Sequence, residues 1–493
     1  MNTSSAKNSN FPSRKVNPKT ICFLIAIVIG LALWFGLQPV NGLTPTGVRA
    51  IAVIVPILFM WLTVNTHWSC LLLFALLILA EVMTPSAVWA GSMGHFAPTL
   101  LLVFVLITQC LSDTGAVDKL AAWFITRKFV QGKPYLFLAM LFFSNIFIGF
   151  FMQNLALTII YIDLVARICE KIGVKKGHSL YIGMMLGTIW VDSVVSIASP
   201  IAKTLPNIMI GSLYTQFGIT ITYAQWLAVG VPYALISLGV IMLCIRIFRP
   251  DVSKLKDLDV EEFSKTVPPI TTRGKVALIT LAVLILAILL PDMLVIMGVF
   301  VPVASYFVRV GATVPAILAV VFLCQFKVKG EPVMDFAQTA KKVPMTLIVF
   351  IAAVVVVGIP ISYEGNGIIV WIGNTLQPIV AAFSPVQIIM TLIFCALLVT
   401  NFISSAVTMV LFFNIGAALL IGTDIHIGAF GILIGLISAM ACLTPSASLT
   451  CPLFFGPEHI TVANSYKINL VNMAFCFVVL LIFIPFVLSI ITG

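Results

Sequence analysis

The chain has 493 residues, of which 61% are hydrophobic and 9% are charged, and its formal net charge is +10. Soluble domains carry about 25% charged residues, so this composition excludes a soluble globular protein and indicates an integral membrane protein. The basic residues are divided among several polar segments, which fits the preference of Lys and Arg for cytoplasmic loops, and we expect no nucleic-acid partner.

The N-terminal segment, residues 1–19, is polar and carries Lys7, Arg14, Lys15 and Lys19 ahead of the first apolar run. Basic residues beside a span favour the cytoplasmic side of the membrane, so we expect a cytoplasmic tail. The run that follows, TICFLIAIVIGLALWFGL, is too long for the core of a signal peptide and predicts a retained span. Runs of about 20 apolar residues, the length that crosses a bilayer, recur along the chain and predict about ten to twelve membrane elements.

Two polar clusters interrupt the apolar sequence of the first half. The segment MQNLAL places Gln153 and Asn154 between apolar residues, and ASPIAKTLPN places a lysine and two prolines inside an otherwise apolar region. Irregular backbone at membrane depth is tolerated only where protein or a watery cavity satisfies its polar groups. A broken helix presents free N–H groups and the positive end of its dipole, which bind anions. The alternative is helix packing, which also uses small polar residues.

Lys203 lies within the second cluster, where a lysine costs about 2.5–3.5 kcal/mol at the centre of a membrane. Two functional roles are open: it binds a substrate carboxylate, or it takes the place of a coupling cation. Two structural roles are also open, because its ammonium could reach the water interface or pair with Asp192. For Asp192 a proton relay, cation coordination or this pairing would account for its apolar surroundings. For Asp163 we expect an ion pair with Arg167, one helical turn away.

A polar segment of mixed charge, residues 250–275, separates two halves of similar length. We expect it to be a cytoplasmic linker, because it carries Lys and Arg beside apolar runs. The first transmembrane repeat then covers residues 20–249, and the second covers residues 276–493.

The two halves carry matching features in the same order. Each has an acidic residue beside Gly followed by an amphipathic segment with Trp, SDTGAVDKLAAWFI in the first half and SYEGNGIIVWIG in the second. Each then has an apolar run broken by a polar cluster, MQNLAL or FISSAVT, and a hydroxyl residue directly before proline, in ASPIAKTLPN or CLTPSASLTCP. Pro-broken segments in corresponding positions of two halves are typical of secondary transporters. We therefore expect an internal repeat.

The stretch GLTPTGVRAIAVIVPILFMWLTVNTHWSCLLLFALLILAEVMTPSAVWAGSMGHFAPTL, with its continuation to Ile125, resembles the N-terminal part of the divalent anion:sodium symporter (DASS) family of dicarboxylate and sulfate permeases. The resemblance extends over the chain after residue 20 and includes the order of the repeats. It implies an all-α polytopic membrane fold of two inverted repeats, each with a re-entrant hairpin and a Pro-broken helix. It also implies a homodimer, an elevator motion of a transport domain, and either sodium coupling or dicarboxylate exchange. Asn154 and Ser404 match the hairpin tips of this family.

The polar clusters supply the candidate site residues. We expect substrate contacts from Gln153, Asn154, Ser199, Pro200, Lys203, Thr204, Ser404, Ser405, Thr408, Thr444 and Pro445. We expect contacts with a coupling ion from Asn154, Ser199, Asn207, Ser405, Ser448 and Thr450. Hydroxyl and amide groups suit an anion that must be released again, because they supply hydrogen bonds without a permanent ion pair. No cofactor or resident metal is expected, and sodium is expected only as a coupling ion.

The predicted function is secondary active transport of small organic anions, di- or tricarboxylates, across the cytoplasmic (inner) membrane. Sodium-coupled symport and exchange are both open, and a permease for sulfate or another inorganic oxyanion is the alternative. A passive anion channel is the alternative mechanism, although paired helix breaks favour alternating access. We expect no enzymatic activity, because the sequence contains no H-E-x-x-H, P-loop or G-x-S-x-G motif.

Overall fold

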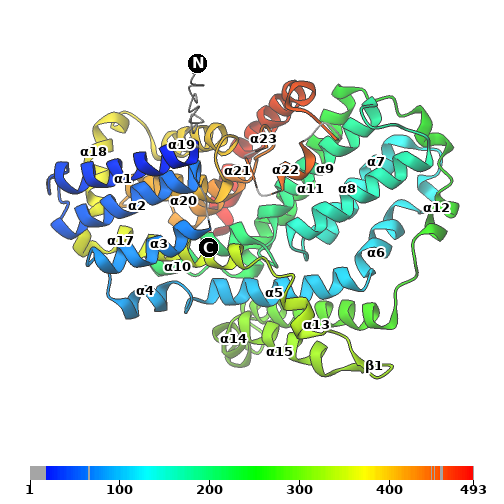
Figure 1. Ribbon diagram of the computed structural model, residues 1–493, viewed down its shortest axis with the longest axis horizontal. Helices are drawn as coiled ribbons and strands as arrows, with labels where there is room; N and C mark the ends of the chain where they lie inside the picture. Colours follow the sequence, from blue (N-terminus) through cyan, green and yellow to red (C-terminus); the bar gives the residue numbers. More distant parts are fainter. Residues whose placement is uncertain (1–17, 65–66, 446, 449, 456–458, 492–493) are drawn as a thin grey trace, which may run out of the picture.

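The computed structural model describes residues 18–64, 67–445, 447–448, 450–455 and 459–491. Within these ranges the chain folds mainly into α-helices, with one antiparallel hairpin formed by β1 (Lys327–Val328) and β2 (Glu331–Pro332) (Figure 1). The predicted N-terminal tail, up to residue 17, lies outside the described residues.

The helices up to the connection between the halves are α1 (Pro18–Gly36), α2 (Pro45–Thr63), α3 (Trp68–Leu79), α4 (Pro85–Gly91), α5 (Phe96–Asp113), α6 (Ala116–Ile125), α7 (Pro134–Gly149), α8 (Asn154–Lys171), α9 (Ser179–Ala198), α10 (Thr204–Phe217), α11 (Tyr223–Phe248) and α12 (Val260–Thr266). The helices that follow are α13 (Thr272–Ile296), α14 (Val301–Val310), α15 (Thr313–Gln325), α16 (Phe336–Ala340), α17 (Met345–Ser362), α18 (Ile368–Val380), α19 (Pro385–Thr400), α20 (Ser405–Leu420), α21 (Ile427–Ser438), α22 (Cys451–Phe454) and α23 (Val462–Ile491).

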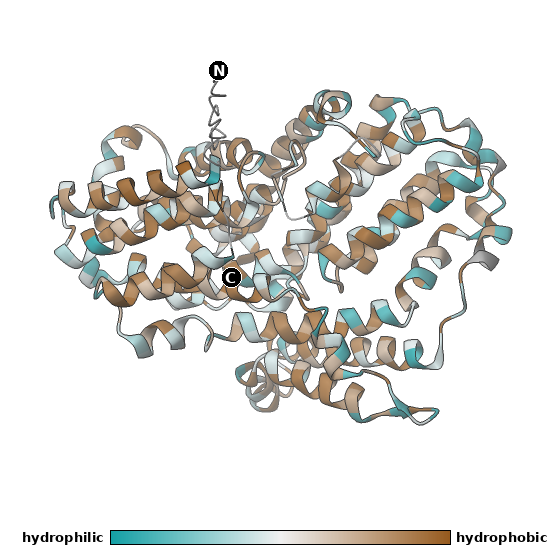
Figure 2. Cartoon of the chain, viewed as in Figure 1, coloured by the Kyte–Doolittle hydropathy of each residue, from teal (hydrophilic) through white to brown (hydrophobic). Residues whose placement is uncertain are grey.

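Eight of the described helices are long and apolar enough to cross a membrane, and the number rises to ten if each of two sharply bent helix pairs is one span. Apolar residues cover most helix surfaces, whereas hydrophilic residues gather in the loops around α12 and at the β1–β2 hairpin (Figure 2). In α1 only Ala26 is buried, because this apolar helix packs on α2 and leaves the rest of its surface open. Such a surface is stable against lipid and unfavourable against water. The structure confirms the predicted all-α polytopic membrane fold.

Two helical hairpins and two interrupted helices pack on one another. The pairs α7–α8 and α19–α20 form the hairpins, with tips at residues 150–153 and 401–404. Irregular segments separate α9 from α10 at residues 199–203, and α21 from α22 at the described residues 439–445, 447–448 and 450. Helices α8, α9 and α22 contact one another, and α10 contacts both α20 and α21. All four irregular segments coincide with the polar clusters of the sequence.

The first break has a definite cause. Pro200 ends α9, because proline has no N–H to continue the helix and restricts the residue before it. Ser199 Oγ then donates a hydrogen bond to the main-chain oxygen of Phe150, at the tip of the first hairpin (2.7 Å). Ala202 adopts the left-handed conformation (φ 57°), which residues other than glycine seldom take. The segment is therefore held in place by its tertiary contacts.

The second break is fastened in the same manner. Thr444 Oγ1 donates to the main-chain oxygen of Asn401, at the tip of the second hairpin (2.5 Å). In both halves the hydroxyl residue that precedes a proline thus binds the break to its own hairpin tip. This likeness agrees with the predicted repeat, whose boundaries, 20–249 and 276–493, stay a prediction.

The connection between the halves packs against the first half. Lys171 and Glu262 form an ion pair (2.6 Å), and Lys254 Nζ donates to the main-chain oxygen of Gly173 (3.1 Å). These contacts join α12 and the preceding turn to the C-terminal end of α8. The connection therefore has a defined position on the protein.

The N-terminus and the connection at 250–275 are predicted to lie on the cytoplasmic side, because both carry Lys and Arg beside spans. Epitope tags at these two places should bind antibody in inside-out vesicles and not in right-side-out vesicles. A tag at Asn41, in the exposed turn between α1 and α2, should show the opposite pattern, since α1 is long and apolar enough to cross the membrane. If the first two tags were accessible from opposite sides, the division into two halves would be wrong.

Candidate functional site

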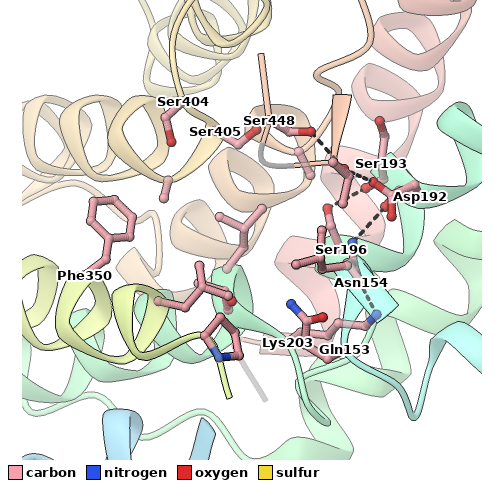
Figure 3. Close-up of a pocket in the computed structure, with 18 of the residues that line it drawn as sticks. Gln153, Asn154, Asp192, Ser193, Ser196, Lys203, Phe350, Ser404, Ser405 and Ser448 are labelled. Atoms are coloured by element: carbon pink, nitrogen blue, oxygen red, sulfur yellow. Dashed lines mark hydrogen bonds between the residues drawn. The ribbon is translucent and has the colours of Figure 1, made fainter. Parts of the chain in front are cut away.

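A cavity of about 380 Å³ lies between the two hairpin tips and the first break. Residues 153–155, 202–205 and 402–406 line it, and α9 and α17 supply further lining residues. Figure 3 shows polar side chains from these segments around one common space. The fold thus brings together segments that are far apart in the sequence.

Three helices begin at the wall of the cavity. The first residues of α8, α10 and α20 are Asn154, Thr204 and Ser405, and all three line the cavity. In the described structure, the side chains at the N-caps of α10 and α20, Lys203 and Ser404, accept no hydrogen bond from the first helical turn. The main-chain N–H groups of the first turn therefore have no side-chain partner at the N-cap of either helix. Because each helix N-terminus carries a partial positive charge, their convergence can bind an anion.

One wall contains a polar bridge formed by Lys203, Asn154 and Asp192 (Figure 3). Lys203 Nζ donates to Asn154 Oδ1, and Asn154 Nδ2 donates to the main-chain oxygen of Asp192 (3.2 Å). The Asp192 carboxylate accepts hydrogen bonds from Thr158 Oγ1 (2.8 Å) and from Thr450 Oγ1. Lys203 is 2% exposed and Asp192 is 6% exposed, so the lysine does not extend to the outer surface. The two opposite charges lie in the same wall and compensate each other.

The opposite wall is mainly apolar, although Ser404 lies on this side as well (Figure 3). Leu347 and Phe350 of α17 line the cavity together with Ile403 and Trp61, and the rings of Trp61 and Phe350 meet edge to face at 5.2 Å. Figure 3 shows Phe350 on the far side of the space from Asp192. A ligand in this cavity therefore meets hydrogen-bond donors on one side and hydrocarbon on the other, as in many small-molecule sites.

The cavity brings together most of the predicted residues from the hairpin tips. The predicted residues that line it are Gln153, Asn154, Lys203, Thr204, Ser404, Ser405, Ser448 and Thr450. Ser448 and Thr450 were expected to contact a coupling ion. They lie 3.0 Å apart between their hydroxyl oxygens, and Thr450 also binds Asp192.

The remaining predicted residues do not line the cavity. Ser199 and Thr444 are engaged with the main chain of the hairpin tips, as described above. Thr408 is fully buried in α20, one turn beyond Ser405, and Pro445 is exposed. The predicted substrate contacts of these side chains are therefore not part of the cavity seen here, and they stay a prediction.

Asn207 is predicted to contact a coupling ion. In the structure its side chain forms hydrogen bonds with the main chain of the first break. Its Nδ2 donates to the main-chain oxygens of Pro200 (2.7 Å) and Lys203 (2.6 Å), and its Oδ1 accepts from the Tyr223 hydroxyl (2.9 Å). These bonds satisfy both ends of the irregular segment. The main-chain oxygen of Pro200 is thus occupied, and the proline itself lies outside the cavity lining.

Some lining residues were absent from the prediction. Ser193 and Ser196 of α9 line the cavity beside Asp192. Residues 192 and 196 are four apart, which places them on one face of the helix, and this spacing could have identified Ser196. Phe350 and Trp61 could not be identified in this way, because apolar residues in a membrane span have no distinguishing sequence signal.

Asp163 is remote from the cavity. It forms the predicted ion pair with Arg167 (3.0 Å), and Arg167 also binds Asp118 (3.1 Å). In the part of the chain that the structure describes, no group of three or more His, Cys, Asp or Glu residues is placed to hold a metal ion.

The chain matches the family model of the citrate transporters (CitMHS) over residues 56–435. Among solved structures it is similar to the crystal structure of the YdaH transporter from Alcanivorax borkumensis, described as having an unusual topology, with a TM-score of 0.53 and 13% sequence identity. That match covers 81% of this chain and 88% of the other, and at this identity it shows the fold alone. No match was found among curated protein sequences.

The matched range contains both hairpin tips and the first break, and therefore most of the segments that build the cavity. The similarity in fold agrees with this match. The chain belongs to the citrate transporter family, which is related to the DASS family that its sequence resembles, and it is a secondary transporter of anions.

Proposed function

We propose that the protein transports small organic anions with two or three carboxylate groups, similar to citrate in size and charge. One observation carries this proposal: the N-termini of α8, α10 and α20 converge on a cavity with donors on one wall and hydrocarbon on the other. The description of the family, which names citrate, supports the same class of substrate.

The two walls suggest how such an anion binds. One carboxylate would accept hydrogen bonds from the open N–H groups at the start of α20 and from the Ser404 hydroxyl. A second carboxylate would lie beside Thr204 and Lys203, at the start of α10. The carbon chain of the substrate would then contact Phe350. Helix dipoles and hydroxyl groups stabilise the anion without a large fixed charge, so the anion can be released again.

Sulfate or another inorganic oxyanion is the alternative substrate. Such an ion would need only one of the helix N-termini, and it would fill a small part of a cavity of about 380 Å³. It would also leave the apolar wall around Leu347 and Phe350 without a function. These features favour an organic anion.

We propose alternating access as the mechanism of transport. Interrupted helices around a central site are typical of secondary transporters, whereas a channel would need a continuous polar path. The resemblance to DASS transporters supports an elevator motion, a homodimer, and either sodium-coupled symport or exchange. Location in the cytoplasmic (inner) membrane belongs to the same proposal.

Ser404→Ala and Asn154→Ala should each raise the apparent KM for citrate or abolish its uptake. Ser404 is expected to donate to a carboxylate, and Asn154 positions Lys203. A hydrogen bond to a charged partner is worth about 1.5–3 kcal/mol, or about ten- to hundredfold in affinity. Uptake by proteoliposomes with equal amounts of inserted protein measures the effect.

The matched controls are Ser489→Ala and Asn374→Ala, because both residues are exposed and lie outside the cavity lining. These variants should transport citrate like the wild-type protein. If Ser404→Ala and Asn154→Ala also behave like the wild type, the hairpin tips serve helix packing and the proposed site is wrong.

Proteoliposomes loaded with unlabelled citrate should take up labelled citrate faster than unloaded ones, because a carrier with a saturable site is stimulated from the opposite side. Phe350→Ala should weaken the competition by citrate analogues that have an intact carbon chain and should leave the weaker competition by sulfate unchanged. Equal, non-saturating uptake in loaded and unloaded vesicles would instead indicate a channel.

A further inference from the structure

Lys203 and Asp192 are the only Lys, Arg, Asp or Glu side chains among the described residues that line the cavity. Lys203 precedes the first residue of α10, and Asp192 lies within α9. A buried charge without compensation is very costly, and these two charges balance in the empty cavity. An entering anion adds negative charge beside this balanced pair, so it needs a positive group that can turn to it.

The hydrogen bonds of the Asp192 carboxylate and of the Lys203 ammonium indicate which of the two groups can change its partner. Two hydroxyl groups from different elements, those of Thr158 and Thr450, hold the Asp192 carboxylate. The ammonium of Lys203 has three N–H donors, and the described structure records one side-chain acceptor for them, Asn154 Oδ1. Because lysine has a long flexible stem, the other two donors can turn to a ligand in the cavity.

We propose that Lys203 is the cation that this site carries within its own chain. The inference rests on the proposed function, and it gives Lys203 the charge that a bound inorganic cation would otherwise supply beside the anion. In the structure Asn154 Oδ1 accepts from the ammonium, and when substrate binds, the ammonium donates to a substrate carboxylate. Anion binding beside Lys203, at the start of α10, then needs no added monovalent cation.

The same arrangement favours exchange over net transport. Without a ligand, the remaining N–H donors of the ammonium form hydrogen bonds with water. Closing the cavity removes this water, which costs free energy because the donors lose their partners. A bound carboxylate satisfies these donors. The loaded protein should therefore convert between its two orientations faster than the empty protein.

The test is citrate binding to the purified full-length protein, measured by calorimetry in choline chloride and in a sodium chloride series of constant ionic strength. The wild-type protein should bind citrate with the same affinity in both salts. Lys203→Met should weaken binding in choline by about ten- to hundredfold, as expected for the loss of a hydrogen bond between charged partners. Sodium should restore part of this loss. Asp192→Asn removes the counter-charge, keeps the shape of the side chain, and should strengthen binding.

Lys119→Met and Asp292→Asn are matched controls, because they make the same changes outside the cavity lining, and they should bind like the wild type. If Lys203→Met fails to fold because Asp192 is left unpaired, the double variant Lys203→Met/Asp192→Asn removes both charges together. It should show weak binding that sodium improves.

Two results would overturn the inference, and they are distinguishable. Steep sodium dependence in the wild type, with unchanged binding in the single or double Lys203 variant, would contradict the role of Lys203 and leave the proposed function intact. If the wild type binds no carboxylate in either salt, the proposed function fails as well.

Discussion

The structure depends on one constraint: a helix interrupted inside a membrane protein must find partners for its main-chain polar groups. An unsatisfied group in an apolar environment costs several kcal/mol. Here the partners are side chains that do not line the cavity. Ser199 and Thr444 join the breaks to the hairpin tips. Asn207 binds two main-chain oxygens of the first break, and Asn401 accepts from the N–H groups of residues 442 and 443 in the second. These hydrogen bonds satisfy main-chain polar groups of each break. The N-termini of the helices at the cavity are therefore available to bind a ligand.

This division of roles explains how a cavity with so few charges can attract an anion. The N-terminal ends of α10 and α20 supply partial positive charge, and the side chains at their N-caps do not neutralise it. Lys203 in the cavity lining is balanced by Asp192, which Thr450 of the second break holds in place. The Asp192 carboxylate of the first half is therefore bound by a hydroxyl group of the second half. Any movement that separates the halves at this point must break that bond.

Much of this arrangement could be predicted from the sequence, because polar residues and prolines inside apolar runs are conspicuous. The hairpin tips at Asn154 and Ser404 and both breaks were located in this way. The direction of the side chains could not be predicted. Ser199 and Asn207 are predicted to contact a ligand, yet they bind main-chain oxygens and do not line the cavity. No sequence pattern identifies Phe350 as a residue of the cavity, since its position there depends on how α17 packs against segments distant in sequence.

The central claim is that an organic anion binds between the N-termini of α8, α10 and α20. A structure of the full-length protein determined with bound citrate tests it most directly. We predict carboxylate oxygens within hydrogen-bonding distance of the main-chain N–H groups at the start of α20 and of Lys203 Nζ, with the carbon chain against Phe350. Citrate bound elsewhere, with the open helix ends facing only water, would contradict this account.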